Sequence, residues 1–343
     1  MAAPLRVLLI GGSGFIGHHV SRALLAAGHH VTILSRGGRE APAGTESLIA
    51  MRRDRAALGR ALEGRRFDLT VDFLVYDAAD IEILLLVPYA ALGRYLMIST
   101  GQVYLVTEGA RSPYREDDSD GPVMAEPAGP ADSYERASWN YGVGKRRAER
   151  ALLGLRATHG VRALILRLPI IQGEGDGSRR LWGYLERMLD GGPLVLPDGG
   201  GAAARFVYVG DVARLIERCA EEPPRNAVYN LAQPDVMPMR SFLDRAAQLA
   251  GLTPQWVEST WDECHAAGLD EDFSPYAGRW RSTLDPSRAA TELGFVGTRT
   301  EDYLPGVVKW HMEHRGPSHH GYALRERELA LAARLAARAE RGA

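Results

Sequence analysis

The sequence has little of what secreted, membrane-bound or disulfide-rich proteins contain. Its 343 residues include two cysteines, Cys219 and Cys264, whose separation fits neither a zinc site nor a redox pair, so we expect no disulfide. No apolar run approaches the ~20 residues of a membrane span. The first residues, Met1 to Pro4, lack the cationic and apolar regions of a signal peptide. These absences predict a cytoplasmic protein.

An excess of charge of one sign is also lacking. Charged residues make up 24% of the chain and hydrophobic residues 45%, and the formal net charge is -2, which is the balance of a globular protein. Because there is no basic surplus, we expect neither a nucleic-acid partner nor a membrane partner. Small-molecule chemistry is therefore the favoured function class. The length suits one large domain, or a main domain with a smaller partner.

Short apolar runs alternate with helix-like stretches from residue 5 to about residue 171. This alternation is typical of a parallel sheet with crossover helices, which predicts an α/β fold. Fully apolar runs such as Val7 to Ile10 suit strands that are covered on both faces. The expected strands are 5–10, 31–34, 48–51, 69–73, 95–98 and 163–166, and the expected helices are 15–27, 55–64, 78–92 and 135–159.

A glycine-rich turn, GGSGFIG at residues 11–17, follows the first expected strand and opens the first expected helix. Glycine permits a tight turn and a close approach to a pyrophosphate, and a helix N-terminus offers unpaired N–H groups. The alternative is a tight turn that binds nothing. We interpret the turn as a cofactor site whose binding residues are Gly11, Gly14, Phe15, Ile16 and Gly17.

The second expected strand ends at Ser35-Arg36-Gly37, where an acidic residue would hold the ribose hydroxyls of NAD. A carboxylate there would repel a 2′-phosphate, whereas the guanidinium of Arg36 can pair with one. We therefore predict NADP(H) as the cofactor, with NAD as the alternative, and Ser35 and Arg36 among its contacts. The alternative for Arg36 is a solvated surface arginine.

Tyr141 and Lys145 form a YxxxK motif within the expected helix 135–159. A spacing of four places the phenol and the ammonium on one helix face. A nearby cation stabilises a phenolate, which allows a tyrosine of reference pKa ~10 to exchange protons nearer neutral pH. The segment ISTGQVY at 98–104 adds hydroxyl groups at Ser99 and Thr100 that could orient a substrate oxygen, or could serve only as a strand-end turn.

Together these motifs resemble the extended short-chain dehydrogenase/reductase family, the NAD-dependent epimerase/dehydratase-like proteins, over roughly residues 5–231. The resemblance implies that Tyr141 transfers a proton, that Lys145 tunes this tyrosine and holds the nicotinamide ribose, and that Thr100 rather than Ser99 orients the substrate. Asp54 would accept a hydrogen bond from the adenine amino group, although it could equally be a helix N-cap. The further cofactor contacts implied are Leu74, Val75, Ser99, Pro169 and Ile171.

The resemblance also implies a fold and its division. We expect a Rossmann-like doubly wound parallel sheet with a smaller, mostly helical C-terminal substrate lobe. The terminal helix packs on its own domain or forms a subunit contact, which leaves a homodimer open. None of His18, His19, His319 and His320 shows metal-ligand spacing, so we expect no metal. The expected parts are a dinucleotide-binding domain over 1–172 with 205–231 returning to it, a substrate lobe of 173–204 and 232–320, and a C-terminal helix over 321–343.

Several positions depart from the sugar-nucleotide enzymes of this family. Gly101 and Gln102 stand where the 4,6-dehydratases carry an acid and a carboxylate base, so that chemistry is not expected. Ile170 stands where a substrate-binding asparagine is usual, and Arg205 lies one residue closer to Asp211 than the diphosphate-binding arginine. Because of these departures, a nucleotide sugar is no more expected as the substrate than a small ketone, aldehyde or natural-product intermediate.

We therefore predict an NADP(H)-dependent oxidoreductase or epimerase. It would transfer a hydride at a carbinol or carbonyl carbon of a sugar-nucleotide or small natural-product-like substrate. One alternative is a non-catalytic nucleotide-sensing or RNA-associated member of the superfamily, because Ser35-Arg36-Gly37 and residues 67–76 look similar to chloroplast RNA-binding relatives. Another is a subunit that binds the cofactor only to stay folded. The complete set of Thr100, Tyr141 and Lys145 favours the enzyme.

Overall fold

The computed structural model describes residues 3–82, 89–222 and 224–342. Its contacts divide the chain into two compact units, which we describe separately. Unit 1 comprises Met1–Ile171, Val207–Ala232 and Ser282–Gly297, and unit 2 comprises Gln172–Phe206, Gln233–Arg281 and Thr298–Ala343.

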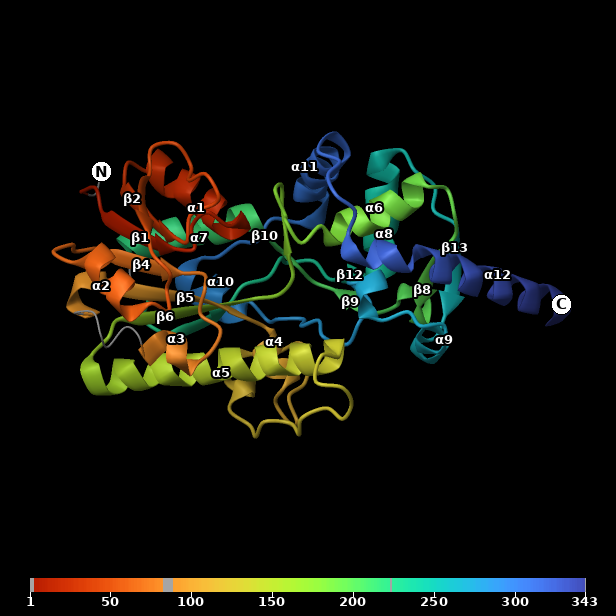
Figure 1. The fold of residues 1–343 in the computed structure, drawn as a ribbon, viewed down its shortest axis with the longest axis horizontal. Coiled ribbons are helices and arrows are strands. Elements are labelled where there is room, and N and C mark those ends of the chain that lie inside the picture. The colour runs from red at the N-terminus through yellow and green to blue at the C-terminus, as the bar shows by residue number, and fades with distance from the viewer. Residues whose placement is uncertain (1–2, 83–88, 223, 343) are drawn as a thin grey trace. The chain divides into compact units, whose positions relative to one another are not determined.

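Unit 1 is built on a seven-stranded parallel sheet (Figure 1) with the strand order β11-β6-β5-β4-β1-β2-β3. The chain winds outward from β1 in one direction and from β4 in the other, so the sheet is doubly wound and the predicted Rossmann-like fold is confirmed. The strands are β1 (Arg6–Ile10), β2 (His30–Ser35), β3 (Glu46–Ile49), β4 (Leu69–Asp72), β5 (Arg94–Thr100), β6 (Ala163–Leu168) and β11 (Val228–Asn230).

Helices cover both faces of this sheet. They are α1 (Phe15–Ala26), α2 (Arg55–Leu62), α3 (Ala78–Glu82), η2 (Tyr89–Leu92), α4 (Gln102–Leu105), η3 (Glu116–Ser119), α5 (Tyr134–His159), α7 (Val209–Glu221) and α10 (Ser287–Leu293). Because successive strand residues point to opposite faces, Val7 and Leu9 of β1 share a core with α1 and α7. Leu8 and Ile10 share the other core with α2 and α5. The apolar run therefore reflects burial on both faces.

The expected elements of the main sheet are observed with small shifts at their ends. The strand expected at 48–51 is observed two residues earlier, as β3. The helix expected over 78–92 is observed as α3 and η2, and residues 83–88 lie outside the described part of the chain. The short strand β10 (Val207–Tyr208) precedes α7, which opens directly after it at Val209.

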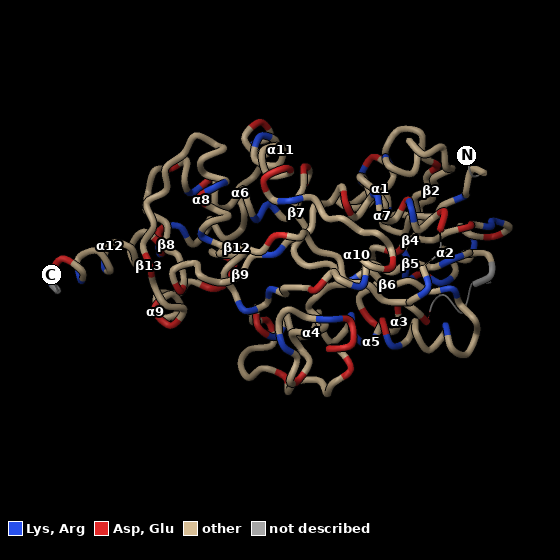
Figure 2. Tube along the Cα trace, turned by 180° about the vertical axis from the view of Figure 1, so that it is seen from behind, with Lys and Arg blue, Asp and Glu red and all other residues tan. Residues whose placement is uncertain are grey.

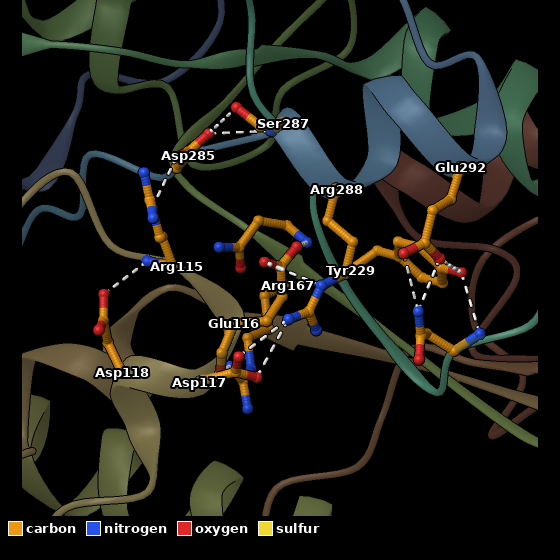
Figure 3. A network of polar contacts seen from close by, with 12 residues as sticks. Arg115, Glu116, Asp117, Asp118, Arg167, Tyr229, Asp285, Ser287, Arg288 and Glu292 are labelled. Atoms are coloured by element: carbon orange, nitrogen blue, oxygen red, sulfur yellow. Dashed lines mark hydrogen bonds and ion pairs between the residues drawn. The ribbon is translucent and has the colours of Figure 1, made fainter.

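Unit 1 also contains the segment Ser282–Gly297, which the sequence places in the substrate lobe. Polar contacts hold this segment (Figure 3). Arg288 pairs with Asp117 of η3 at 3.1 Å, and Tyr229 of β11 donates to Glu292 at 2.8 Å. These contacts join residues that lie far apart in the sequence, which is why local patterns do not predict them.

Unit 2 is mostly helical and contains two short strand pairs. β8 (Leu194–Pro197) pairs in parallel with β13 (Trp256–Ser259), and β9 (Ala203–Ala204) pairs antiparallel with β12 (Met237–Pro238). Among the described residues, no helix combines the length and apolar character that crossing a bilayer requires. The helices are α6 (Arg180–Leu189), η4 (Asp198–Gly200), α8 (Met239–Ala250), α9 (Trp261–Ala266), η5 (Glu271–Phe273), α11 (Thr300–Glu313), η6 (His320–Leu324) and α12 (Arg325–Gly342), and β7 (Ile171–Gln172) leads into the unit.

Candidate active site

The glycine-rich turn connects β1 to α1 at the carboxyl edge of the sheet. Gly11 has a φ of +83°, which side-chain-bearing residues rarely adopt. A Cβ on Gly17 would lie 2.5 Å from the backbone of Gly12, so α1 approaches the turn too closely for a side chain there. A Cβ on Gly14, the N-cap of α1, would meet only the Gly11 carbonyl oxygen, at 3.4 Å, within the described structure. The turn is therefore open on the side that Gly14 faces.

The first turn of α1 fits a bound anion. Gly14 supplies no side-chain cap to the helix, so the first N–H groups, which include those of Phe15 and Ile16, have no intrahelical acceptor. The positive end of the helix dipole points to the same place. Open space at Gly14 and unsatisfied donors behind it are what the pyrophosphate of a dinucleotide needs, so these residues fit the cofactor.

The other predicted cofactor contacts lie along the same edge, because they follow the carboxyl ends of neighbouring parallel strands. Leu74 follows β4, and its side chain packs against Gly11, where a Cβ would lie 2.6 Å from the leucine Cγ. Val75 beside it is buried. Pro169 and Ile171 follow β6, with the proline buried and the isoleucine half-buried.

The residues predicted for the adenosine half lie at the far end of this edge. Ser35 ends β2 and accepts a hydrogen bond from the Gly37 N–H at 3.2 Å, and Arg36 is exposed. Asp54 accepts from the Ala57 N–H at 2.9 Å, so it is the N-cap of α2. The capping alternative for Asp54 is thus observed, and a contact to adenine stays a prediction.

Lys145 is the buried centre of the site, with 3% of its surface exposed. Its ammonium donates to the Ile98 carbonyl oxygen of β5 at 2.9 Å and lies 5.8 Å from the centre of the Tyr141 ring. Burial lowers the pKa of Lys145 to about 8. Tyr141 is 36% exposed, so part of this residue lies at the surface while Lys145 beside it is buried.

Two glycines explain how the YGVGK segment packs so closely. A Cβ on Gly144 would lie 2.4 Å from the Tyr76 carbonyl oxygen, and a Cβ on Gly142 would lie 2.8 Å from Val106. Glycine inside a helix is ordinarily unfavourable by about 1 kcal/mol relative to alanine. The close approach of α5 to the loop after β4 and to α4 requires it here.

Thr100 and Ser99 have different surroundings at the end of β5. Ser99 is buried and donates to Glu149 of α5, a carboxylate that also binds Arg167 at 2.6 Å. Thr100 is half-buried, and its hydroxyl oxygen accepts from the Gln102 N–H at 3.2 Å. Because neighbouring strand residues point to opposite faces, Thr100 points away from the Glu149 pair.

The structure therefore brings the end of β5 against one stretch of α5. Lys145 anchors to Ile98, and the Gln102 side-chain amide donates to the Ser138 carbonyl oxygen at 2.9 Å. Thr100 lies between Ile98 and Gln102 in sequence, just as Tyr141 lies between Ser138 and Lys145. The three predicted catalytic groups thus lie on two segments, and these two hydrogen bonds hold the segments together.

Tyr76 is a site residue that the sequence did not single out. It follows β4, is 49% exposed, and its ring lies 5.3 Å from the Lys145 ammonium and 6.5 Å from the Tyr141 ring. An aromatic face at this distance attracts a cation. Its position beside Lys145 depends on the packing of α5, which local patterns in the sequence do not predict.

The position of Gly101 is filled by a neighbour. A Cβ on Gly101 would lie 2.0 Å from Ser282 Oγ and 2.8 Å from Leu284. A longer acidic side chain therefore has no space there without rearrangement.

Comparisons with known proteins agree with this site. The profile of the NAD dependent epimerase/dehydratase family matches residues 7–232. The chain belongs to this family. It is an NAD(P)-dependent enzyme of the dehydrogenase/reductase or epimerase class, which favours the enzymatic prediction over the non-catalytic alternatives. Figure 2 shows Lys and Arg interspersed with Asp and Glu along the trace.

Two relatives are reductases from Streptomyces. The family member described here is 29% identical over 290 residues to the 2'-dehydrokanamycin reductase of Streptomyces kanamyceticus, covering 82% of this chain and 77% of that protein. It is 28% identical over 261 residues to a 3-diazoavenalumate denitrifying reductase of a Streptomyces species, covering 73% and 83%. The UDP-glucose 4-epimerase of Thermotoga maritima, solved with UDP-glucose, superposes with a TM-score of 0.70 at 18% identity, covering 91% and 100% of the two chains, which shows a common fold.

Proposed function

We propose that this enzyme is an NADP(H)-dependent oxidoreductase that interconverts a carbonyl and a carbinol in a small natural-product-like substrate. The observation that carries the proposal is the buried Lys145 ammonium beside the partly exposed Tyr141. A cation held at this distance favours the phenolate over the phenol. Tyr141 can therefore give and recover a proton near neutral pH.

Each group then has one role. The bound nicotinamide would supply or accept the hydride. Tyr141 donates its proton to the substrate oxygen during reduction and removes it during oxidation, while Lys145 stabilises the phenolate. The Thr100 hydroxyl hydrogen-bonds the same substrate oxygen and holds it beside Tyr141. The glycine turn, the first turn of α1 and the residues after β2, β4 and β6 hold the cofactor.

The choice of lysine supports this role. The chain contains two lysines, Lys145 and Lys309, and uses arginine at its 39 other cationic Lys or Arg positions. An arginine stays protonated at every relevant pH, whereas burial brings the Lys145 pKa to about 8. The residue buried beside Tyr141 is therefore one whose charge can change near neutral pH.

Arg36 supports a preference for NADP(H). It is exposed directly after β2, where no carboxylate competes for the ribose. A guanidinium pairs bidentately with a phosphate. Titration of the purified enzyme with NADPH and NADH tests this preference: Arg36→Ala should weaken NADPH binding about tenfold or more and leave NADH binding nearly unchanged. Equal losses for both cofactors would contradict it.

The substrate class rests on the departures from the sugar-nucleotide pattern. Gly101 is blocked by Ser282, and Ile170 has no polar group to offer. Arg205 donates to the backbone carbonyl oxygens of Gln233 and Pro234 within unit 2, which occupies donors that a diphosphate would use. The names of the two reductase relatives refer to 2'-dehydrokanamycin and 3-diazoavenalumate and not to a nucleotide sugar, which favours a natural-product substrate.

A direct experiment compares substrate panels. The enzyme with NADPH is offered aminoglycoside-type ketones, aryl and alkyl ketones, and UDP- and dTDP-4-ketosugars, with Tyr141→Phe as the control for enzyme-dependent oxidation of NADPH. Turnover of a ketone without a nucleotide, abolished by Tyr141→Phe, supports the proposal. Turnover confined to the nucleotide sugars would overturn the substrate class, and turnover that survives Tyr141→Phe would overturn the mechanism.

A further inference from the structure

We propose that His29, Glu217 and Glu221 form a binding site for a divalent metal ion, with zinc as the best match. One ligand atom of each residue lies within 4.8 Å of those of the other two. The site belongs to unit 1 but not to the active site. His29 precedes β2 and the two glutamates end α7, so all three lie at the amino edge of the parallel sheet, opposite the glycine turn.

Rigid elements hold the three residues. Helices α1 and α7 pack together on one face of the sheet through buried residues that include Leu24 and Ile216. His29 follows α1 by three residues, and Glu217 and Glu221 are four residues apart on α7, so their side chains leave the same face of the helix. Glu217 is half-buried and Glu221 exposed. Their flexible side chains can close to the bond lengths of about 2.0–2.2 Å that zinc requires.

The histidine supplies the observation that points to a ligand. His29 is 5% exposed, and its Nε2 is buried without a hydrogen-bond partner among the described residues. The other ring nitrogen, Nδ1, accepts from the Leu5 N–H at 3.3 Å. A buried polar atom that lacks a partner costs about 1–3 kcal/mol. A ligand between Nε2 and the carboxylates removes that cost.

The electrostatics at the C-terminal end of α7 also favour a bound cation. Two carboxylates four residues apart repel each other, and these two lie near the helix C-terminus, where the dipole is negative. Neither forms an ion pair within the described part of the chain. Two neighbouring arginines bind backbone: Arg94 donates to the Cys219 carbonyl oxygen at 2.7 Å, and Arg218 to the Gly294 carbonyl oxygen at 3.4 Å.

The donor set selects the metal. One imidazole nitrogen with two carboxylate oxygens suits zinc better than calcium or magnesium, which prefer oxygen alone. Because Nδ1 accepts a hydrogen bond, the neutral ring carries its proton on Nε2. Binding of a metal at Nε2 moves this proton to Nδ1 with no net release, and the hydrogen bond from the Leu5 N–H is lost because Nδ1 then carries a proton of its own. This cost predicts moderate affinity.

Calorimetric titration of the chelator-treated full chain with zinc chloride at pH 7.5 tests the site. Wild type should bind one ion, and His29→Gln or the double variant Glu217→Gln/Glu221→Gln should weaken binding at least about tenfold. Matched controls are His30→Gln and Glu222→Gln, which change the exposed neighbours of the cluster. Zinc should raise the Tm of wild type and of both controls, and not that of the ligand variants.

Two kinds of result would overturn the metal site. Absence of saturable one-to-one binding to wild type overturns the proposal, and so does binding that persists in the double variant or falls equally in the controls. The carboxylate variant lies at the surface, so it decides the matter even where His29→Gln fails to fold. NADPH binding should stay unchanged in the ligand variants, because the active site lies at the other edge of the sheet. Failure of the wild type to bind NADPH would contradict the proposed function and not the metal site.

Discussion

Replacing Lys145 with methionine should make the protein more stable at neutral pH and nearly inactive. Methionine has a similar length, suits the buried site and carries no charge. Burial lowers the lysine pKa from 10.5 to about 8, and each pKa unit corresponds to about 1.4 kcal/mol, so burying the ammonium costs about 3 kcal/mol. The variant also loses the hydrogen bond to the Ile98 carbonyl oxygen, which lowers its stability by about 1 kcal/mol. The variant should therefore be more stable by about 2 kcal/mol at pH 7.

The pH dependence of this difference identifies its cause. Between pH 8 and 10.5 the unfolded lysine is protonated and the folded one is not, so the unfolded state binds more protons and wild-type stability rises with pH. The advantage of Lys145→Met should shrink across this window and then reverse. Urea unfolding at pH 7, 8, 9 and 10 measures it. Lys309→Met, at a lysine that is 75% exposed, should show no such trend. A constant difference between Lys145→Met and wild type would refute the reasoning.

Three other predictions concern the surroundings of this lysine. Tyr141→Phe should lower kcat/KM by roughly 10²–10⁴-fold in steady-state assays while fluorescence titration shows nearly unchanged NADPH binding. Tyr76→Ala should admit water to the buried ammonium and raise its pKa, which moves the alkaline limb of the kcat profile upward, whereas Tyr76→Phe should leave that limb in place. Glu149→Gln leaves the buried Arg167 guanidinium without its counter-charge and should cost about 3–5 kcal/mol in urea unfolding, and a loss below 1 kcal/mol would contradict the importance of that pair.

The main sheet could be predicted because its signals are local. A fully apolar run such as Val7 to Ile10 becomes a strand covered by helices on both faces, and the glycine turn that follows it opens α1 at Phe15, as expected. The YxxxK spacing placed Tyr141 and Lys145 on one helix face for the same reason. Such features depend on neighbours within a few residues along the chain.

Contacts between distant segments could not be predicted. The carbonyl oxygen that anchors Lys145 belongs to Ile98, and the aromatic ring beside it belongs to Tyr76. The sequence shows only that Gly101 lacks an acid, whereas the structure shows that Ser282 fills the space. That serine was expected in another part of the molecule. Only the path of the chain after residue 281 reveals the contact.

The direction of the strands and helices explains where the two proposed ligands, a dinucleotide and a metal ion, would bind. In a doubly wound sheet, each crossover helix starts near the carboxyl edge of the strands and ends near the amino edge. The positive end of α1 therefore faces the carboxyl edge at Gly14, where a pyrophosphate fits, and the negative end of α7 faces the amino edge at Glu221. Two carboxylates strengthen that negative end. The same topology thus favours an anion at one edge and a cation at the other, and zinc binding without any change in NADPH affinity would be its direct consequence.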